Sequence, residues 1–266
     1  MAHDFSGKVA LVTGGASGIG AAAARHFAAA GARVMIGDIQ QELGQSVAKE
    51  IGDAASFQPV DVTELSQVES LTNAAVEAFG RLDFVFNNAG IGSFGETPDL
   101  DPEQWRRVID VDLHSVFYGC RAAIPHLRAA GGGAIVNTAS ISGLGADYGF
   151  SAYNAAKGAV VNYTRTLAID HGKEGIRVNA VCPGPIDTPL ASILVDNDQI
   201  RAMYDAAIPL GRVGVADEVA SVVMFLCSED ARYVTGQALA IDGGITAHTG
   251  QPNFTRVFRE ILGAGN

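Results

Sequence analysis

The sequence has few cysteines, and their spacing excludes two kinds of scaffold. Cys120, Cys182 and Cys227 are odd in number, lie far apart and show no CxxC or Cys/His ligand spacing. A disulfide framework or a zinc site is therefore not expected. The six histidines show no ligand spacing or catalytic pairing either, so no metal site is predicted. We expect the cysteines to be small buried hydrophobic residues of a protein in a reducing compartment.

Basic residues are also scarce, and they do not cluster. The chain has 18 Lys and Arg against 29 Asp and Glu, a formal net charge of -11 and a pI near 4.9. This balance argues against nucleic acid or an anionic membrane surface as the main partner and favours a small soluble ligand. The sequence also lacks a charged N-terminal segment before an apolar run, and any run of about 18 apolar residues. We therefore predict a cytoplasmic protein with no membrane partner.

The chain is rich instead in short apolar runs separated by amphipathic stretches. With 48% hydrophobic residues over 266 positions, it can bury the core of one large α/β domain. The runs are too apolar for half-exposed strands and are typical of a parallel sheet covered on both faces. Strands are expected over residues 8–13, 33–38, 54–60, 82–88, 133–140, 176–182 and 237–242.

Helical patterns fill the intervals between these strands. Thr63 and Ser66 precede one of them, and the Asp101-Pro102-Glu103 sequence opens another. Helices are expected over residues 17–30, 40–50, 64–79, 103–129, 151–172 and 216–228. Strict alternation of this kind predicts right-handed βαβ units in one doubly wound Rossmann domain, with a mostly parallel seven-stranded sheet and helices on both faces.

Two stretches break the alternation within this single domain of residues 1–266. Residues 184–212 are interpreted as a lid, because long connections in a compact domain are often functional. The tail, residues 247–266, includes a short amphipathic run near Val257 to Leu262. It could cap the pocket of a neighbouring subunit or fray as a terminus.

The octapeptide TGGASGIG, residues 13–20, follows the first expected strand and opens the first expected helix. Gly14, Gly18 and Gly20 allow a sharp turn, a close approach to a pyrophosphate, and tight seating of a helix whose N-terminal N–H groups face the anion. A glycine-rich turn alone is a weak signal, because tight βα connections also use glycine. Its position between strand and helix favours a dinucleotide site.

Two acidic residues follow later strands. Asp38 ends the second expected strand about twenty residues on, where a carboxylate can accept both ribose hydroxyls of an adenosine and repels a 2′-phosphate. The next residue is Ile39, so no arginine stands there to receive that phosphate, and NAD is predicted over NADP. A solvated strand-end acid is the alternative for Asp38. Asp61 is either a turn residue before a helix or, with Val62, a contact to adenine.

Five motifs resemble those of the short-chain dehydrogenase/reductase family in order and spacing. They are TGGASGIG, NNAG at 87–90, NTAS ending in Ser140, YNAAK with Tyr153 and Lys157, and PGPIDT at 183–188. The resemblance covers roughly residues 6–245 and implies an NAD-dependent enzyme that assembles as a homotetramer.

The resemblance also implies contacts to the cofactor. Asn88, Ala89 and Gly90 line its path, while Ile186 and Thr188 hold the carboxamide. Lys157 also grips the nicotinamide ribose. The whole implied cofactor-binding set is Gly14, Ser17, Gly18, Ile19, Gly20, Asp38, Asp61, Val62, Asn88, Ala89, Gly90, Tyr153, Lys157, Pro183, Gly184, Ile186 and Thr188.

The chemistry of the SAYNAAK stretch agrees with this resemblance. Tyr153 and Lys157 lie at i and i+4, on one face of a helix, so that the ammonium favours the ionised phenol. Bringing a tyrosine pKa of about 10 near neutrality requires about 4 kcal/mol, which a cation in a partly dry pocket and an oxidised nicotinamide can supply. Tyr153 is then the general acid/base, and Ser140 holds the substrate oxygen. A solvated helix pair, worth a few tenths of a kcal/mol, is the alternative.

One position departs from the family pattern. Within IDVDLHSVFYG the family usually has Asn where this chain has Asp112, and that Asn fixes a water that links the lysine to solvent. Asp112 can still bind water, but an ionised carboxylate near Lys157 offsets part of the pull on the phenol. We treat Asp112 as a candidate relay residue, the alternative being a helix residue that satisfies local backbone groups.

The expected substrate pocket is apolar with a few hydroxyls, and no Arg or Lys is placed to clamp a carboxylate. This composition favours small neutral alcohols and ketones. The substrate-binding candidates are Ser140, Ser142, Tyr148, Tyr153 and Pro185, and the further expected wall residues are Ile91, Leu144, Ile186 and Leu190. The stretches NTASISGLGADYG and DGGITAHTGQP are similar to those of bacterial meso-2,3-butanediol (acetoin-forming) dehydrogenases.

Other functions are compatible with the sequence. Within the family, oxidation of 3-oxoacyl, hydroxysteroid, sugar or aromatic alcohol substrates remains open. A protein of another class, a sensor that binds NAD without turnover, is opposed by the Ser140, Tyr153 and Lys157 set, because binding alone does not require it.

Overall fold

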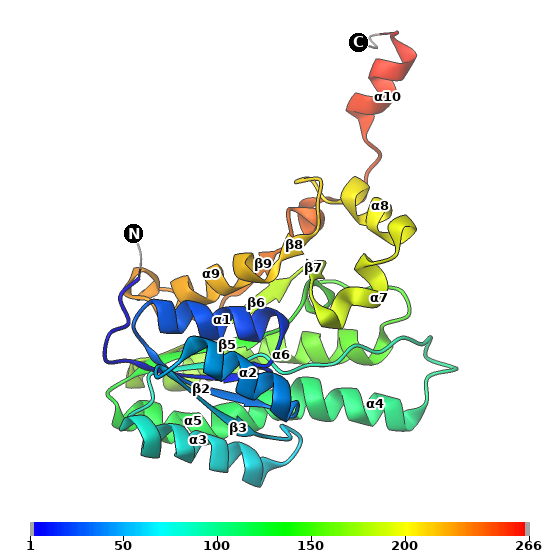
Figure 1. Cartoon of the computed structure of the whole chain (residues 1–266). Helices are drawn as coiled ribbons and strands as arrows, with labels where there is room; N and C mark the ends of the chain where they lie inside the picture. The colour runs from blue at the N-terminus through cyan, green and yellow to red at the C-terminus, as the bar shows by residue number, and fades with distance from the viewer. Residues whose placement is uncertain (1–2, 264–266) are drawn as a thin grey trace.

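Seven parallel strands form the centre of the molecule (Figure 1). The computed structural model describes residues 3–263. The strands lie in the order β3-β2-β1-β4-β5-β6-β9, and every neighbouring pair is parallel. Their bounds are β1 Val9–Thr13, β2 Arg33–Asp38, β3 Ala55–Pro59, β4 Phe84–Asn87, β5 Gly133–Thr138, β6 Ile176–Pro183 and β9 Ala238–Ile241. All seven expected strands are confirmed.

Helices cover both faces of this sheet. One layer holds α1 (Gly18–Ala29), α2 (Gln41–Ile51) and α9 (Ala216–Cys227), which pack on one face in a core with Val12, Ile36 and Phe86. The other holds α3 (Leu65–Phe79), α5 (Ser115–Ala129) and α6 (Ser151–His171). Because each strand presents side chains to both layers, the strands are almost continuously apolar, as the sequence predicted.

The order of the strands places the site. The chain runs outward from β1 to β3 and then returns to the other side of β1 at β4. At such a point of reversal the connections leave a crevice beyond the carboxyl ends of the strands. Thr13, Asp38 and Asn87 end β1, β2 and β4 at this edge, so residues far apart in the sequence meet there.

The expected helix 103–129 is not continuous. It divides into α4 (Pro102–Ile109), a π-helical turn (Asp110–His114) and α5. Residues 103–118 contain neither glycine nor proline, so the interruption leaves no mark in the pattern. The turn carries Asp112, whose side chain bonds to the Ile91 N–H of another segment. Wider turns of this kind are frequent at functional sites.

The segment 184–212 contains structure of its own. It includes the short strand β7 (Ile186–Asp187), which pairs with β8 (Gly214–Val215), and the helices α7 (Ser192–Val195) and α8 (Asp198–Ala207). The Asn197 side chain accepts the N–H groups of Gln199 and Ile200 and so begins α8. Val195, Ile208 and Val213 form a small apolar cluster that holds the segment together.

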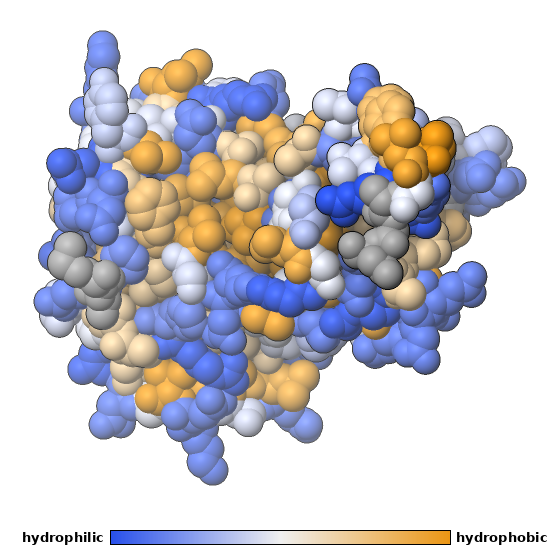
Figure 2. Space-filling model, turned by 90° about the horizontal axis from the view of Figure 1, so that it is seen from above, coloured by the Kyte–Doolittle hydropathy of each residue, from blue (hydrophilic) through white to orange (hydrophobic). Residues whose placement is uncertain are grey.

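The tail forms a helix that projects from the body (Figure 1). This helix, α10 (Phe254–Ile261), has no buried residue. Seen from above, hydrophobic surface gathers on it (Figure 2), where Phe254, Phe258, Ile261 and Leu262 are exposed. The predicted amphipathic run is therefore helical and begins slightly earlier than expected.

The cysteines are all buried and free, as predicted. Burial raises the pKa of the Cys120 and Cys227 thiols to about 12, so neither is a reactive thiolate. Between residues 3 and 263, no helix combines the length and the hydropathy needed to span a bilayer.

Candidate active site

A cavity of about 810 Å³ opens at the carboxyl edge of the sheet. Its wall joins the glycine-rich turn after β1 to Ser140, Tyr153 and Lys157. The cavity is therefore large enough for a dinucleotide and a small second molecule beside it.

The glycines of the turn are required by its geometry. Gly14 and Gly18 have φ angles of 65° and 51°, in the left-handed region. A Cβ on Gly20 would lie 2.1 Å from the Gly14 carbonyl oxygen, and one on Gly14 would lie 2.8 Å from the Ala89 Cα. Gly14 and Gly18 line the cavity, whereas Gly20 lies behind the wall and lets α1 approach the turn.

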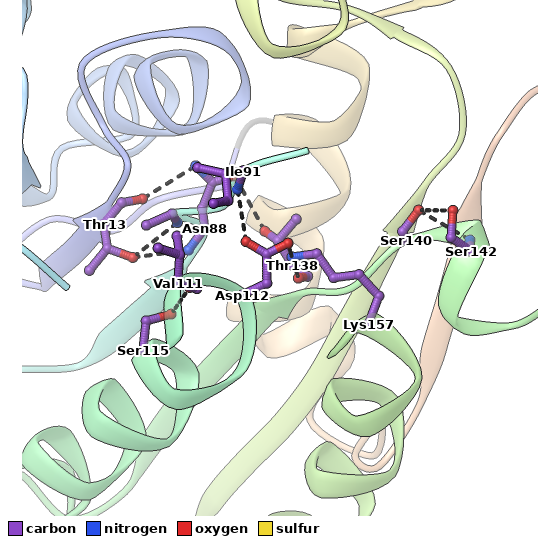
Figure 3. Close-up of polar contacts among 11 residues, drawn as sticks. Thr13, Asn88, Ile91, Val111, Asp112, Ser115, Thr138, Ser140, Ser142 and Lys157 are labelled. Carbon is purple, nitrogen blue, oxygen red and sulfur yellow. Dashed lines mark hydrogen bonds and ion pairs between the residues drawn. The ribbon is translucent and has the colours of Figure 1, made fainter. Parts of the chain in front are cut away.

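Asn88 ties this turn to two neighbouring strands (Figure 3). Its N–H donates to the Thr13 Oγ1 at 3.0 Å, and its Nδ2 donates to the Gly14 carbonyl at 3.2 Å. Its Oδ1 accepts from the Thr138 hydroxyl at 3.3 Å. Asn88 also lines the cavity, so it both shapes the turn and borders the ligand space. Thr13 and Thr138 lie within the TGGASGIG and NTAS motifs, but neither was predicted as a site residue.

Asp38 lies at the cavity wall with both oxygens fixed. Its Oδ2 accepts the Ala16 N–H at 3.0 Å, and its Oδ1 accepts the Gln40 N–H at 2.9 Å. Each carboxylate oxygen keeps a lone pair for a ligand hydroxyl. Ile39 is 68% exposed and offers no charge beside it.

Asp61 has the turn role that the sequence left open, and it also lines the cavity. Its Oδ1 accepts the Thr63 N–H at 2.9 Å and the Thr63 hydroxyl at 2.7 Å. The remaining candidates of the cofactor set all border the same cavity: Ser17, Ile19, Val62, Ala89, Gly90, Pro183, Gly184, Ile186 and Thr188. The glycine-rich turn leaves no room for a Cβ at Gly14 or Gly20, and it lies next to the fixed Asp38 carboxylate. This combination fits a dinucleotide.

Lys157 reaches the other half of the cavity from α6 (Figure 3). It is 2% exposed, and its Nζ donates to the Thr138 carbonyl at 3.0 Å. The same Nζ lies 5.5 Å from the centroid of the Tyr153 ring. Tyr153 and Lys157 therefore lie side by side on one face of α6, as predicted.

Asp112 is completely buried beside this lysine. Its Oδ1 accepts the Ile91 N–H at 2.7 Å, and its Oδ2 lies 3.7 Å from the Lys157 Nζ without a hydrogen-bond partner among the described residues. Burial raises the pKa of the Asp112 carboxyl, although the Lys157 ammonium and the Ile91 N–H oppose this. The Asp112 Oδ2 is thus a buried acceptor beside the Lys157 ammonium that can still bind a proton or a water molecule.

The pKa of Tyr153 is raised, in contrast to the expected lowering. Burial of the phenol is the largest cause; the Lys157 ammonium lowers the pKa but does not outweigh it. The Asp112 and Asp147 carboxylates raise it further, while the Ser140 hydroxyl lowers it. The lysine alone therefore leaves the phenol protonated, because desolvation penalises the phenolate more than one cation stabilises it.

Ser140 follows β5 and is buried at the cavity wall. Its oxygen accepts the Ser142 N–H at 3.1 Å, and its hydroxyl donates to the Ser142 Oγ at 3.1 Å (Figure 3). The Ser142 hydroxyl in turn donates to the Asp147 carboxylate. Asp147 was not among the predicted residues, and its spacing from Ser140 gives no signal for it.

The structure changes the expected substrate wall. Tyr148 is fully exposed, and neither it nor Leu144 borders the cavity, because the loop turns their side chains to solvent. Ser142, Pro185, Ile91 and Leu190 do border it. Wall residues that sequence reasoning missed are Phe150, Leu194, Tyr204 and Ile245.

Two arginines also reach the cavity wall, although none was expected there. Arg106 and Arg107 come from α4. The Arg106 guanidinium is paired with both carboxylate oxygens of Glu103 at 2.6 Å. Both arginines lie far in sequence from Ser140 and Pro185, so no local pattern links them to the pocket.

Comparison with known proteins agrees with this geometry. The family model described as enoyl-(acyl carrier protein) reductase matches residues 14–246. The meso-2,3-butanediol dehydrogenase of Serratia marcescens is 42% identical over 250 residues, which are 93% of this chain and 98% of that protein. The cyclohexanol dehydrogenase of Acinetobacter sp. (strain SE19) is 43% identical over 251 residues, with coverages of 93% and 98%.

A solved structure extends the agreement to three dimensions. The crystal structure of levodione reductase matches with a TM-score of 0.88 at 36% identity, over 91% of this chain and 99% of that one. The matches run through nearly the whole chain. This chain is therefore a member of the short-chain dehydrogenase/reductase family of oxidoreductases.

Proposed function

We propose that the protein is an NAD-dependent dehydrogenase that interconverts a small neutral secondary alcohol and its ketone. One observation carries this proposal: Tyr153, with Lys157 beside it, shares a cavity with Asp38 and the glycine-rich turn. A protein that only binds the dinucleotide needs Asp38 and the glycine-rich turn but not Tyr153 and Lys157. A proton-transfer group beside it is what an oxidoreductase requires.

A nicotinamide cofactor held by Asp38 and the glycine-rich turn would supply the hydride chemistry, and the residues of the protein handle the proton. For oxidation, the Tyr153 Oη takes the proton of the substrate hydroxyl, and for reduction it returns one to the carbonyl oxygen. Because the Tyr153 pKa is raised by burial, ionisation of the phenol needs positive charge beyond that of Lys157. Lys157 holds its own position through the Thr138 carbonyl. Ser140 orients the substrate oxygen, and Asp112 receives or supplies protons behind Lys157.

The proposed substrate class rests on the wall and on the relatives. Ile91, Leu190, Leu194 and Tyr204 give the wall a largely apolar character. The relatives named above act on 2,3-butanediol and on cyclohexanol. We propose 2,3-butanediol with acetoin, or a similar small diol, as the first pair to test. Hydroxysteroids form the second candidate class, because a 3-alpha-(or 20-beta)-hydroxysteroid dehydrogenase of Mycobacterium tuberculosis is 39% identical.

Turnover tests the proposal directly. The purified protein is incubated with NAD+ and a panel of secondary alcohols, and NADH is followed by its absorbance. Reduction of the pyridine nucleotide by at least one neutral alcohol is expected. NADH binding without turnover on any alcohol or ketone of the panel would instead identify a sensor.

Asp38→Asn is expected to weaken the preference for NAD. The amide keeps one acceptor oxygen, but it loses the charge that repels a 2′-phosphate and one strong acceptor for the ribose. We expect the ratio of kcat/KM with NADP+ to kcat/KM with NAD+ to rise about tenfold, as for the loss of one charged hydrogen bond. Steady-state rates with both cofactors measure this ratio. An unchanged ratio would remove Asp38 from cofactor selection.

We also propose that the cytoplasmic enzyme is a homotetramer in which residues 184–212 act as a lid. Support for assembly comes from apolar side chains that α5 and α6 leave outside the core. Phe117 is 43% exposed beside Tyr163, and Ile169 is 81% exposed. Light scattering is expected to give four times the mass of the 27.5 kDa chain, and a smaller mass for Phe117→Glu. A monomeric unmodified protein would contradict this assembly.

A further inference from the structure

A short chain of hydrogen bonds lies behind Ser140 and ends at a charge. An exposed carboxylate can only accept hydrogen bonds, so the Ser142 hydroxyl must donate its single proton to Asp147. The Ser142 Oγ is then left as an acceptor, and the Ser140 hydroxyl donates to it at 3.1 Å. The direction of both bonds follows from the carboxylate alone.

This direction decides what Ser140 can offer a ligand. Its proton is engaged by Ser142, and one of its two lone pairs accepts the Ser142 N–H. While the Tyr153 phenol is protonated, one lone pair of Ser140 therefore remains toward the cavity. A lone pair matches the hydroxyl of an alcohol, which can donate to it. It repels the carbonyl oxygen of a ketone, which has only lone pairs.

The loop that carries Asp147 is fixed next to the catalytic tyrosine. The Asn154 Nδ2 donates to the Asp147 carbonyl at 2.9 Å, and the Asp147 N–H donates to the Asn154 Oδ1 at 3.4 Å. Asn154 directly follows Tyr153 in α6. The carboxylate is therefore held at the cavity wall.

The charge of Asp147 reaches across the cavity. After burial, which is the larger cause, Asp147 raises the pKa of the Tyr204 phenol. It also contributes to the raised pKa of Tyr153, after burial and Asp112. Negative charge at this wall opposes anionic substrates and is compatible with a neutral alcohol.

We infer that Asp147 is a positioning residue that, through Ser142, turns Ser140 into a hydrogen-bond acceptor and so makes the resting site bind alcohol in preference to ketone. This inference rests on the proposed function and specifies its ligand preference. A ketone can be held by Ser140 only after the serine hydroxyl leaves Ser142. The equilibrium of the reaction itself is unaffected, so a change in binding is offset in the rate constants.

The test compares both ligands in one state of the enzyme, with NADH bound. The KM of the ketone in reduction is measured together with the inhibition constant of the corresponding alcohol against that ketone. Asp147→Ala frees Ser142 and thus the Ser140 hydroxyl. We expect the ratio of ketone KM to alcohol inhibition constant to fall about fivefold, the effect of one ordinary hydrogen bond.

Three further variants separate positioning from general damage. Ser142→Ala breaks the same chain at its middle, so it is expected to give the same fall, and the double variant no further fall. Asp147→Asn keeps an accepting oxygen and is expected to stay within about twofold of the unmodified protein. Asp99→Asn, which removes an exposed charge outside the chain of hydrogen bonds, serves as the matched control.

The outcomes are distinguishable. A ratio that is unchanged in Asp147→Ala and Ser142→Ala, or effects that add in the double variant, would overturn the inference while the proposed function stands. A fall in Asp99→Asn as large as in Asp147→Ala would overturn it too, since charge alone would then account for the effect. No turnover by the unmodified protein would overturn the proposed function and this inference with it.

Discussion

Tyr153→Phe is expected to lower kcat for alcohol oxidation by about 10³-fold, because it removes the phenol proposed to take the substrate proton. The phenylalanine ring can keep the contacts of the tyrosine ring, with the Lys157 Nζ 5.5 Å from its centroid and the Phe150 ring centroid at 6.3 Å. The fold and the dinucleotide site should therefore persist. Formation of NADH from the preferred alcohol measures the loss.

Two controls accompany this variant. NADH binding, followed by fluorescence, should match that of the unmodified protein and so exclude unfolding. Tyr148→Phe should leave the rate unchanged, because Tyr148 is fully exposed and does not border the cavity. Oxidation that continues undiminished in Tyr153→Phe would disprove the assignment of the acid/base.

Asp112→Ala is expected to lower kcat by about 10²-fold, since it removes the acceptor of the Ile91 N–H and the carboxyl nearest the Lys157 ammonium. A displacement of Lys157 of about 1 Å suffices for an effect of that size. Loss of one partner of a buried pair is also costly, at about 3 to 5 kcal/mol of folding free energy. The melting temperature must therefore be measured together with the rate.

Asp112→Asn should retain activity and shift its pH profile to lower pH. The amide keeps an acceptor for the Ile91 N–H but removes the negative charge that raises the Tyr153 pKa. We expect the Asp112 carboxyl to be ionised in the alkaline range, which is where the Tyr153 phenol loses its proton. Oxidation needs the ionised phenol. The increase of the oxidation rate with pH should therefore begin at a lower pH in Asp112→Asn than in the unmodified protein. Equal and unchanged rates and profiles in both variants would remove Asp112 from the mechanism.

The fold was predictable because its signal is local. Runs such as 9–13 and 34–36 are apolar without alternation, a pattern typical of strands buried on both faces. Right-handed crossovers then leave few arrangements of seven such strands. The break of the helix after Ile109 was not predictable: the turn places Asp112 in contact with Ile91, more than twenty residues earlier, and no local pattern shows such a contact.

The candidate site was predictable to the extent that it consists of motifs. The glycine turn, Ser140, Tyr153 and Lys157 border one cavity, as the spacing indicated. Tyr148 was assigned to the pocket from its position in the sequence, but the direction of a loop side chain depends on the backbone around it. The pKa of Tyr153 was expected to fall, because the sequence displays the cation but not the degree of burial.

The sequence by itself determined the sheet, the dinucleotide turn and the family, because apolar periodicity and glycine spacing are properties of short segments. The tertiary structure decided which groups act on those segments from afar. Only folding brings Asp112 to 3.7 Å from Lys157 and shields the Tyr153 phenol from water. Only folding aligns Asp147 behind Ser140. Electrostatic effects depend on distance in space and on burial, and neither quantity is written in the order of the residues.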